Sequence, residues 1–270
     1  MKDEKYQLNE TDWWCEEIPC LHRVYKTAPI QGAHKIQKKL GMTISLSSLE
    51  KKLMALSNKV KELNYKYNLK KKALLTFDDG HKDVLLSIPL LKKFPDIQPV
   101  LFMTGRQFNG EVIPLPLTAL YTWCDRNNRD PNKLMEDFGF DRLSLKLLPE
   151  NEQRQRLEDA GIDINPQEEE MLNLKDLDYL NNCDWLIGYH GNYHCDLRIH
   201  RAVDIEDDFK RDLRLLLSIG YVPWIAWPEG CWNKDLYLMA ERLGFTMQFG
   251  LSSKKYEGKE LKMLNRVIWK

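Results

Sequence analysis

Short apolar runs alternate along this chain with amphipathic segments of helical period. The apolar runs predict strands at 18–25, 73–78, 99–105, 184–189, 221–227, 245–250 and 264–269. The helical patterns cover 41–67, 84–94, 174–182, 203–220 and 233–244, and Ser47 with Glu50 predicts a capping box near the start of the first one. This alternation is typical of α/β folds with parallel strands. In such folds the loops at the carboxyl ends of the strands converge and form the site.

One stretch breaks the alternation. From about residue 108 to about residue 170 the pattern weakens, and charged, Asn-rich and Pro-containing segments predict an insertion with short helices of its own. A chain of 270 residues can bury one large core. We therefore expect a single domain over residues 1–270 that carries an insertion at about 108–170.

Composition and charge exclude several classes of function. Forty basic and forty acidic residues give a formal net charge of zero, so no field favours nucleic acid or an anionic membrane. No run of about 18 apolar residues predicts a transmembrane helix, and the acidic start lacks the pattern of a secretory signal. The six cysteines contain no CxxC pair and are typical of reduced thiols. We expect a cytoplasmic protein without an integral membrane segment.

Two adjacent carboxylates follow the strand predicted at 73–78. In the segment TFDDG, Asp78 and Asp79 stand at the end of an apolar run and precede Gly80. Adjacent side chains leave the backbone in different directions, so one could bind a metal while its neighbour activates water. Taken alone, the motif also fits a simple turn that caps the next helix.

Two histidines follow the strand predicted at 184–189. His190 and His194 are four residues apart and could hold one ion if the segment turns helically. Neutral imidazoles together with a carboxylate suit zinc or a similar divalent metal. A single histidine would be explained by packing or capping, but two at ligand spacing beside a strand-end carboxylate pair favour a metal site.

A Pro-x-Gly turn follows the strand predicted at 221–227. In the segment AWPEGCWN, Pro228 and Gly230 flank Glu229. A rigid turn of this kind can point a backbone N–H into a cleft, where it would stabilise an oxyanion. The bare pattern also occurs in ordinary turns.

Taken in this order, the segments resemble the polysaccharide deacetylase family, also called the NodB-homology family or carbohydrate esterase family four. The resemblance runs from LHRV through TFDDG, VLFMTG, IGYHGNYH and YVPWIAWPEG to NRVIW. It implies an α/β fold, a distorted and incomplete (β/α)7 barrel. It also implies one divalent metal ion, preferably Zn²⁺, held by Asp79, His190 and His194. The general base would then be Asp78, and the Glu229 N–H would hold the oxyanion.

The chain departs from the family pattern around the Pro-x-Gly turn and near its last segment. Ala226 and Trp227 stand where many members have an arginine before the proline, and Glu229 stands where they have a tyrosine. A main-chain donor survives such changes, whereas a side-chain contact to the base or substrate does not. The late Leu-x-His motif that supplies the catalytic acid in many members is also absent.

His22 is our candidate for the missing acid. Some members of the family are circularly permuted, so that the strand with the acid histidine opens the domain, and their early segment resembles IPCLHRV. An imidazole titrates near neutrality, so a positioned imidazolium can protonate a leaving amine. The alternative is a buried core histidine or a polar residue at a strand end.

The reaction that the resemblance implies is hydrolysis of an N-acyl group, acetyl or formyl, from an amino sugar. A cytoplasmic location favours a nucleotide-linked, lipid-linked or oligosaccharide precursor of a surface polysaccharide. Trp227, Pro228 and Gly230 are the expected substrate-binding residues. Trp185, Trp224, Trp227 and Trp232 would either stack on sugar rings or pack in the core. Two alternatives stay open: a catalytically silent carbohydrate-binding protein of the same fold, and a metal-dependent hydrolase of another C–N amide bond.

Overall fold

The computed structural model describes residues 12–14, 18–27, 31–167, 169–251 and 261–269. The strands are β1 (Trp13–Trp14), β2 (Ile18–Leu21), β3 (Arg23–Tyr25), β4 (Thr43–Ser45), β5 (Lys72–Phe77), β6 (Ile97–Met103), β7 (Leu186–Tyr189), β8 (Trp224–Ala226), β9 (Met247–Leu251) and β10 (Met263–Ile268). The α-helices are α1 (Ala33–Lys39), α2 (Leu46–Tyr67), α3 (Ile88–Leu91), α4 (Gly105–Phe108), α5 (Pro116–Arg126), α6 (Pro131–Asp137), α7 (Arg142–Lys146), α8 (Glu150–Asp159), α9 (Leu174–Asn182), α10 (Ala202–Ser218) and α11 (Lys234–Leu243). Short 3-10 turns are η3 (Lys82–Ser87), η4 (Leu197–Ile199) and η5 (Pro228–Gly230).

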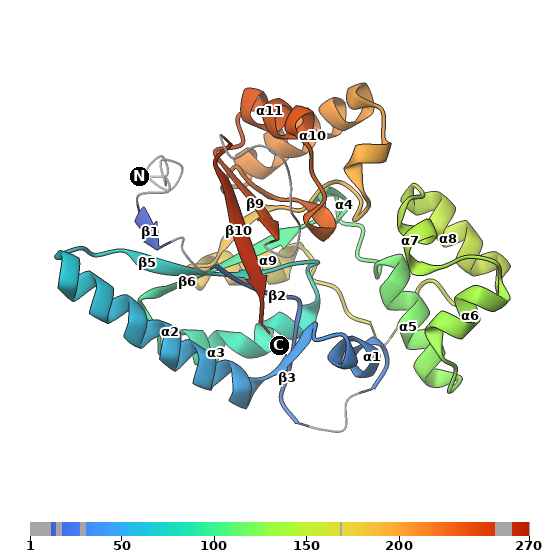
Figure 1. The fold of residues 1–270 in the computed structure, drawn as a ribbon, viewed down its shortest axis with the longest axis horizontal. Helices are drawn as coiled ribbons and strands as arrows, with labels where there is room; N and C mark the ends of the chain where they lie inside the picture. Colours follow the sequence, from blue (N-terminus) through green and yellow to red (C-terminus); the bar gives the residue numbers. More distant parts are fainter. Residues whose placement is uncertain (1–11, 15–17, 28–30, 168, 252–260, 270) are drawn as a thin grey trace.

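Seven parallel strands form the centre of the molecule (Figure 1). Their order is β5, β2, β10, β9, β8, β7 and β6, and β6 pairs again with β5. The weakest link lies between β7 and β8, where only Tyr189 and Ile225 are in register. The strands are buried along most of their length, which explains their nearly continuous apolar runs. The predicted (β/α)7 barrel is confirmed.

The inside of the barrel has its own apolar cluster. Successive side chains of a strand point to opposite faces, so every second residue points inward. The inward apolar positions include Ile18, Leu74, Phe102, Trp224, Phe249 and Leu264. By the same alternation Cys20, Asp78 and Arg266 also face the interior. Polar and charged groups therefore occupy the carboxyl end of an otherwise apolar barrel.

Two local predictions were wrong in detail. The segment 18–25 is not one strand, because the chain leaves the barrel at His22 and continues as β3, which pairs with β4. Helix α2 does not begin with a capping box at Ser47 and Glu50. Its N-cap is Ser45, whose hydroxyl accepts the N–H of Ser48. Three serines in SLSS offer the same chemistry, and the end of β4 at Ser45 determines which of them is used.

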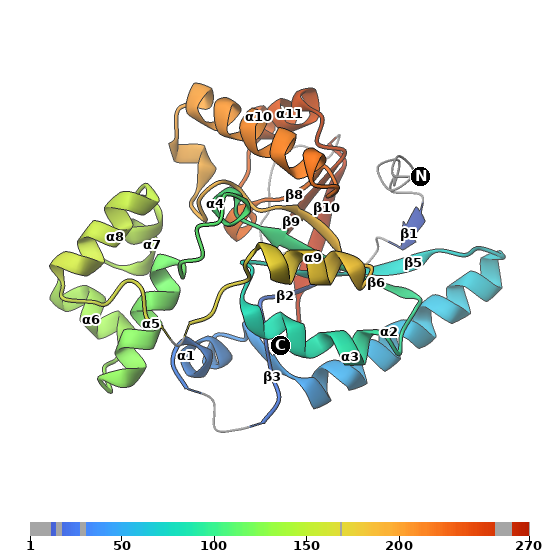
Figure 2. The same ribbon diagram turned by 180° about the vertical axis from the view of Figure 1, so that it is seen from behind.

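Helices α5 to α8 lie to one side of the barrel (Figure 2). They form a separate apolar cluster, which includes Leu120, Leu134, Phe140, Leu145 and Leu157. Ala33 of α1 belongs to the same cluster, so the segment is anchored to the barrel through α1. These helices lie within the predicted insertion, and the single-domain organisation stays a prediction. In the part of the chain that the structure describes, no helix is long and apolar enough to cross a bilayer.

Candidate active site

The polar side chains at the carboxyl ends of β5 and β7 meet at one edge of the barrel. Asp78 and Asp79 follow β5 directly, and His190 follows β7. Asp79 has a φ of 73°, in the left-handed region that costs a non-glycine residue about 1 kcal/mol or more. Gly80 also has a positive φ, and a Cβ there would lie 2.6 Å from the Gln107 side chain. The turn is therefore strained and tightly packed, as is common where geometry is set by function.

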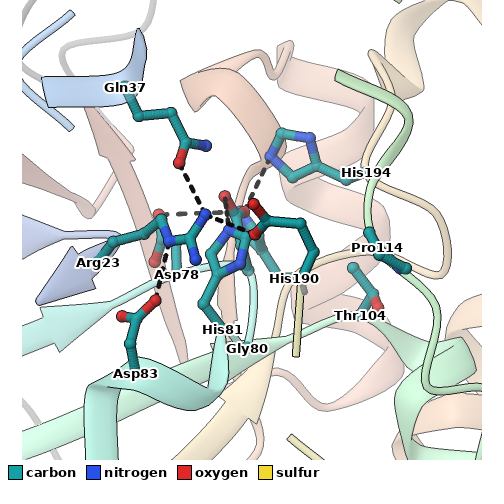
Figure 3. Close-up of polar contacts among 12 residues, drawn as sticks. Arg23, Gln37, Asp78, Gly80, His81, Asp83, Thr104, Pro114, His190 and His194 are labelled. Carbon is teal, nitrogen blue, oxygen red and sulfur yellow. Dashed lines mark hydrogen bonds and ion pairs between the residues drawn. The ribbon is translucent and has the colours of Figure 1, made fainter. Parts of the chain in front are cut away.

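Asp79, His190 and His194 form a compact set of potential metal ligands. The Oδ1 atom of Asp79 lies 3.5 Å from Nε2 of His190 and 3.3 Å from Nε2 of His194. Two ligand atoms at tetrahedral positions about 2.0–2.1 Å from a zinc ion would be about 3.3 Å apart. In Figure 3 the His194 ring points toward the carboxylates beside His190. Their spacing fits one ion.

The protonation and orientation of these three residues also suit a metal. The Oδ1 atom of Asp79 is buried and has no hydrogen-bond partner among the described residues. Burial alone would raise the pKa of Asp79, but His194 and the other nearby histidines bring this pKa well below its usual value. Nδ1 of His190 lies 2.7 Å from the carbonyl oxygen of Ala226, which it can donate to while leaving Nε2 free as a ligand.

Asp78 lies beside this set in a different environment. Its Oδ1 accepts a 2.6 Å hydrogen bond from the buried guanidinium of Arg266 on β10. The Cys20 thiol, whose pKa is raised by burial, donates to Oδ2 over 3.4 Å. Burial would raise the pKa of Asp78, but Arg266 and then His190 lower it below its ordinary value. Asp78 is thus held as a carboxylate that can accept a proton.

Arg266 is a site residue that the sequence pattern did not identify. It is 1% exposed and lies at an inward position of β10, two residues after the inward Leu264. A charge at an inward position of an apolar strand was the signal that could have found it. The chain lacks the arginine that many members carry before the proline, and here a guanidinium from β10 pairs with the predicted base instead.

His22 lies next to Asp78. Atoms of Cys20, His22 and Asp78 that could bind a metal all lie within 4.8 Å of one another. A protonated thiol and an arginine already paired with Asp78 make this a poor cation site, so the Asp79 group is the better candidate for holding an ion. The Nδ1 atom of His22 is buried without a hydrogen-bond partner in the described part of the chain. The predicted acid is therefore near the predicted base, and its role stays a prediction.

The Pro-x-Gly turn closes against the histidine loop. Glu229 has a φ of 55°, and Gly230 has a φ of 65°. A Cβ on Gly230 would lie 2.9 Å from Leu251, so this position requires glycine. The Pro228 ring would lie 3.1 Å from a Cβ on Gly191, which places the turn against the loop between the two histidines. Nε2 of His194 is 4.0 Å from Oε1 of Glu229, so the turn borders the candidate metal site.

The tryptophans near the strand ends are packing residues. Trp185, Trp224, Trp227 and Trp232 are all 5% exposed or less. The Trp227 ring packs against Phe209 in the core, with 6.0 Å between their centroids. The Trp227 ring thus lies in the core in this structure, and its role as a substrate-binding residue stays a prediction. Pro228 and Gly230 are also buried, and they shape the turn.

A buried ion-pair network lies behind the acidic turn. Arg23 of β3 pairs with Asp83 and Glu169 at 2.8 Å each, and it also donates to Gln37 (Figure 3). Asp83 accepts the backbone N–H of Val24 as well. These contacts fix the segment that follows the turn. His81 is fully buried there, and burial with the Arg23 charge lowers its pKa to about 4, so it is neutral.

Solved structures resemble this arrangement of strands and helices. The Streptococcus pyogenes deacetylase PplD, in complex with acetate, superposes with a TM-score of 0.55 at 16% identity, over 93% of this chain and 91% of that one. A polysaccharide deacetylase from Bacillus cereus gives a TM-score of 0.54 at 12% identity, over 94% of this chain and 64% of that one. The chain has the polysaccharide deacetylase fold.

A third structure with this fold is a de-N-acetylase from Aggregatibacter actinomycetemcomitans. Its TM-score is 0.51 at 15% identity, and the match covers 93% of each chain. No protein-family model and no curated protein sequence matches this chain. The likeness therefore rests on the path of the backbone, and the chemistry has to be argued from the side chains.

In this polysaccharide deacetylase fold the helical insertion covers the candidate site. A cavity of about 30 Å³ is lined by Asp79, His194 and Glu229 from the barrel. Tyr121, Arg142 and Lys146 line it from α5 and α7. Lys146 forms a short ion pair with Glu229. Sequence periodicity could not reveal this contact, because it joins two segments that are about 80 residues apart and have unrelated patterns.

Proposed function

We propose that this chain is a metal-dependent deacylase that hydrolyses an acetyl or formyl group from the nitrogen of an amino sugar. The observation that carries the proposal is the Asp79, His190 and His194 set, with an unpartnered buried carboxylate oxygen, directly beside the arginine-paired Asp78. When bound, a divalent ion such as Zn²⁺ would supply Lewis-acid polarisation of the amide carbonyl and activation of water.

The protein side chains would divide the proton transfers between them. Asp78 would accept a proton from the attacking water, because Arg266 holds it ionised. The main-chain N–H of Glu229 would donate to the developing oxyanion from the strained turn. His22 would protonate the leaving amine, since a ring nitrogen of His22 lies within 4.8 Å of a carboxylate oxygen of Asp78, the proposed base.

We propose an amino-sugar precursor of a surface polysaccharide as the substrate, either nucleotide-linked, lipid-linked or an oligosaccharide. The protein would work in the cytoplasm. The fold of the deacetylases supports a carbohydrate substrate, and the balanced charge gives no support for a nucleic-acid partner.

The direct test is mass spectrometry of N-acetylated and N-formylated amino sugars incubated with the metal-loaded protein. Loss of the acyl mass in wild type, and its retention with Asp78→Asn, would support the proposal. Sugar binding without any acyl loss would instead support a silent carbohydrate-binding protein. Turnover confined to cyclic amides or simple formamides would support the hydrolase of another C–N bond.

A further inference from the structure

The cavity above the candidate metal site is asymmetric in charge. Its insertion side carries two basic residues, Arg142 and Lys146, which are four residues apart on α7 and therefore lie on one face of the helix. Its barrel side offers the Glu229 carboxylate outside the metal set. Lys146 uses that carboxylate in its ion pair. The second cation on this face, whose charge also helps to lower the pKa of Glu229, forms no ion pair of its own among the described residues.

Arg142 is that cation. No carboxylate lies within ion-pair distance of it in the described ranges, and its Nε atom is buried without a hydrogen-bond partner. Its charge is felt in the cavity, since it helps to lower the pKa of Lys146, which burial lowers most. Burying a guanidinium without an ion-pair partner costs free energy, and an anion from outside the chain would offset this cost at Arg142.

The cavity is too small to admit an anionic ligand unless a side chain that lines it moves. About 30 Å³ is room for little more than one or two water molecules, so a sugar cannot fit while Lys146 and Glu229 are joined across it. The Lys146 side chain is 14% exposed and sits on the short helix α7, so rotation of a flexible four-carbon side chain would open the cavity. Lys146 would then also be available to a ligand.

We propose that Arg142, together with Lys146, binds a phosphate or carboxylate group carried by the amino-sugar substrate, next to the acyl group being removed. The inference rests on the proposed function and adds the substrate class. Arginine presents a planar fork of donors that matches both anions, and lysine adds a point charge. Because Arg142 lines the same cavity as Asp79 and His194, the anion would lie on the acylated sugar or on its direct linkage.

The test compares three substrates on the metal-loaded full chain. N-acetylglucosamine 1-phosphate carries a phosphate, N-acetylmuramic acid carries a carboxylate, and methyl N-acetylglucosaminide is neutral. Wild type should prefer at least one anionic compound, and the preferred compound identifies the anion. In Arg142→Gln the ratio of kcat/KM for that compound to kcat/KM for the neutral one should fall about ten-fold or more, mostly through KM. Arg142→Lys should restore part of the ratio.

The matched control is Arg156→Gln, which removes an exposed arginine from α8 in the same insertion. Its ratio should equal that of wild type. A wild type that prefers the neutral compound, or an Arg142→Gln variant with an unchanged ratio, would overturn the inference.

A binding measurement separates this inference from the proposed function. Calorimetry should show that Asp78→Asn binds N-acetylglucosamine 1-phosphate or N-acetylmuramic acid about ten-fold or more tightly than Asp78→Asn combined with Arg142→Gln does. If that difference appears but no amino sugar is ever deacylated, the proposed function fails while the anion site stands. If deacylation occurs and the two proteins bind equally, the anion site fails alone.

Discussion

Asp78, Asp79 and His190 are all positioned by strands of the barrel, whereas Arg142 and Lys146 come from a short helix of the insertion. The barrel side is fixed by a ring of parallel strands and by buried pairs such as Asp78 with Arg266. The insertion side rests on a small separate apolar cluster, and at the cavity it meets the barrel side through the Lys146–Glu229 ion pair. In the proposed function, reaction chemistry and substrate choice would thus lie on two sides of one cavity that are built separately. Variants of residues on the barrel side test this division.

Removal of the histidine ligands should have the largest effect. His190→Ala and His194→Ala should each lose bound metal and nearly all turnover, because each removes one of three ligands at tetrahedral spacing. Metal analysis by mass spectrometry checks this. His200→Ala is the control, since His200 contacts Cys195 and lies outside the ligand set. Unchanged metal content in both ligand variants would refute the site.

Asp78→Asn should retain the metal and lose about a hundred- to ten-thousand-fold in turnover, because an amide cannot accept the proton from water. Metal content and single-turnover rates should be measured on the same sample. If Asp78→Asn lost the metal and Asp79→Asn kept it, the two aspartates would have to exchange roles.

His22→Ala should keep its fold and metal and lose about a hundred-fold or more in turnover. The expected defect is slower release of the amine, so an activated substrate with a leaving group that needs no proton should recover much of the rate. Equal loss on both kinds of substrate would show that His22 acts in folding or in binding.

Arg266→Met tests the ion pair between Arg266 and Asp78, the proposed base. The wild-type Asp78 pKa is lowered below its ordinary value by Arg266, so activity should persist until the pH falls through that low value. Without the guanidinium the pKa should rise, and the acidic limb of the kcat/KM profile should move to higher pH. The variant should also lose about 3–5 kcal/mol of stability, because a buried carboxylate is left unpaired. If the acidic limb of the kcat/KM profile lay at the same pH in the variant and in wild type, another group would be the base.

Glu229→Gln should have the smallest effect on catalysis. Its main-chain N–H is retained, so turnover at saturation should change less than about ten-fold. The Glu229 pKa, which burial would raise, is lowered to about 2 by Lys146 and His194. The ion pair therefore stabilises the protein above the ordinary pKa of 4.5, and this stabilisation is lost as the pH falls toward 2. The Tm gap between wild type and variant should shrink between pH 6 and pH 3.

The sequence predicted the barrel side far better than the insertion side, for a physical reason. Buried parallel strands give apolar runs, and their carboxyl ends must meet, so TFDDG and HGNYH could be placed together from pattern alone. Arg266 and Lys146 were missed because their partners, Asp78 and Glu229, are brought near only by the closed ring and by the packing of the insertion. The sequence also left open whether Trp227 stacks on a sugar or packs, because the pattern of residues does not show that its ring is buried in the core.

The pairing of β2 with β10 brings together Ile18 and Arg266, which are 248 positions apart in the chain. Contacts of such high sequence separation form late, since a long loop must close before they stabilise anything. While a ribosome has made the chain only as far as β9, β2 has one unpaired edge and Asp78 has no guanidinium beside it. The nascent chain would therefore expose its first barrel strand to other chains until β10 emerges, and Asp78, the proposed base, would gain its arginine partner at the same moment.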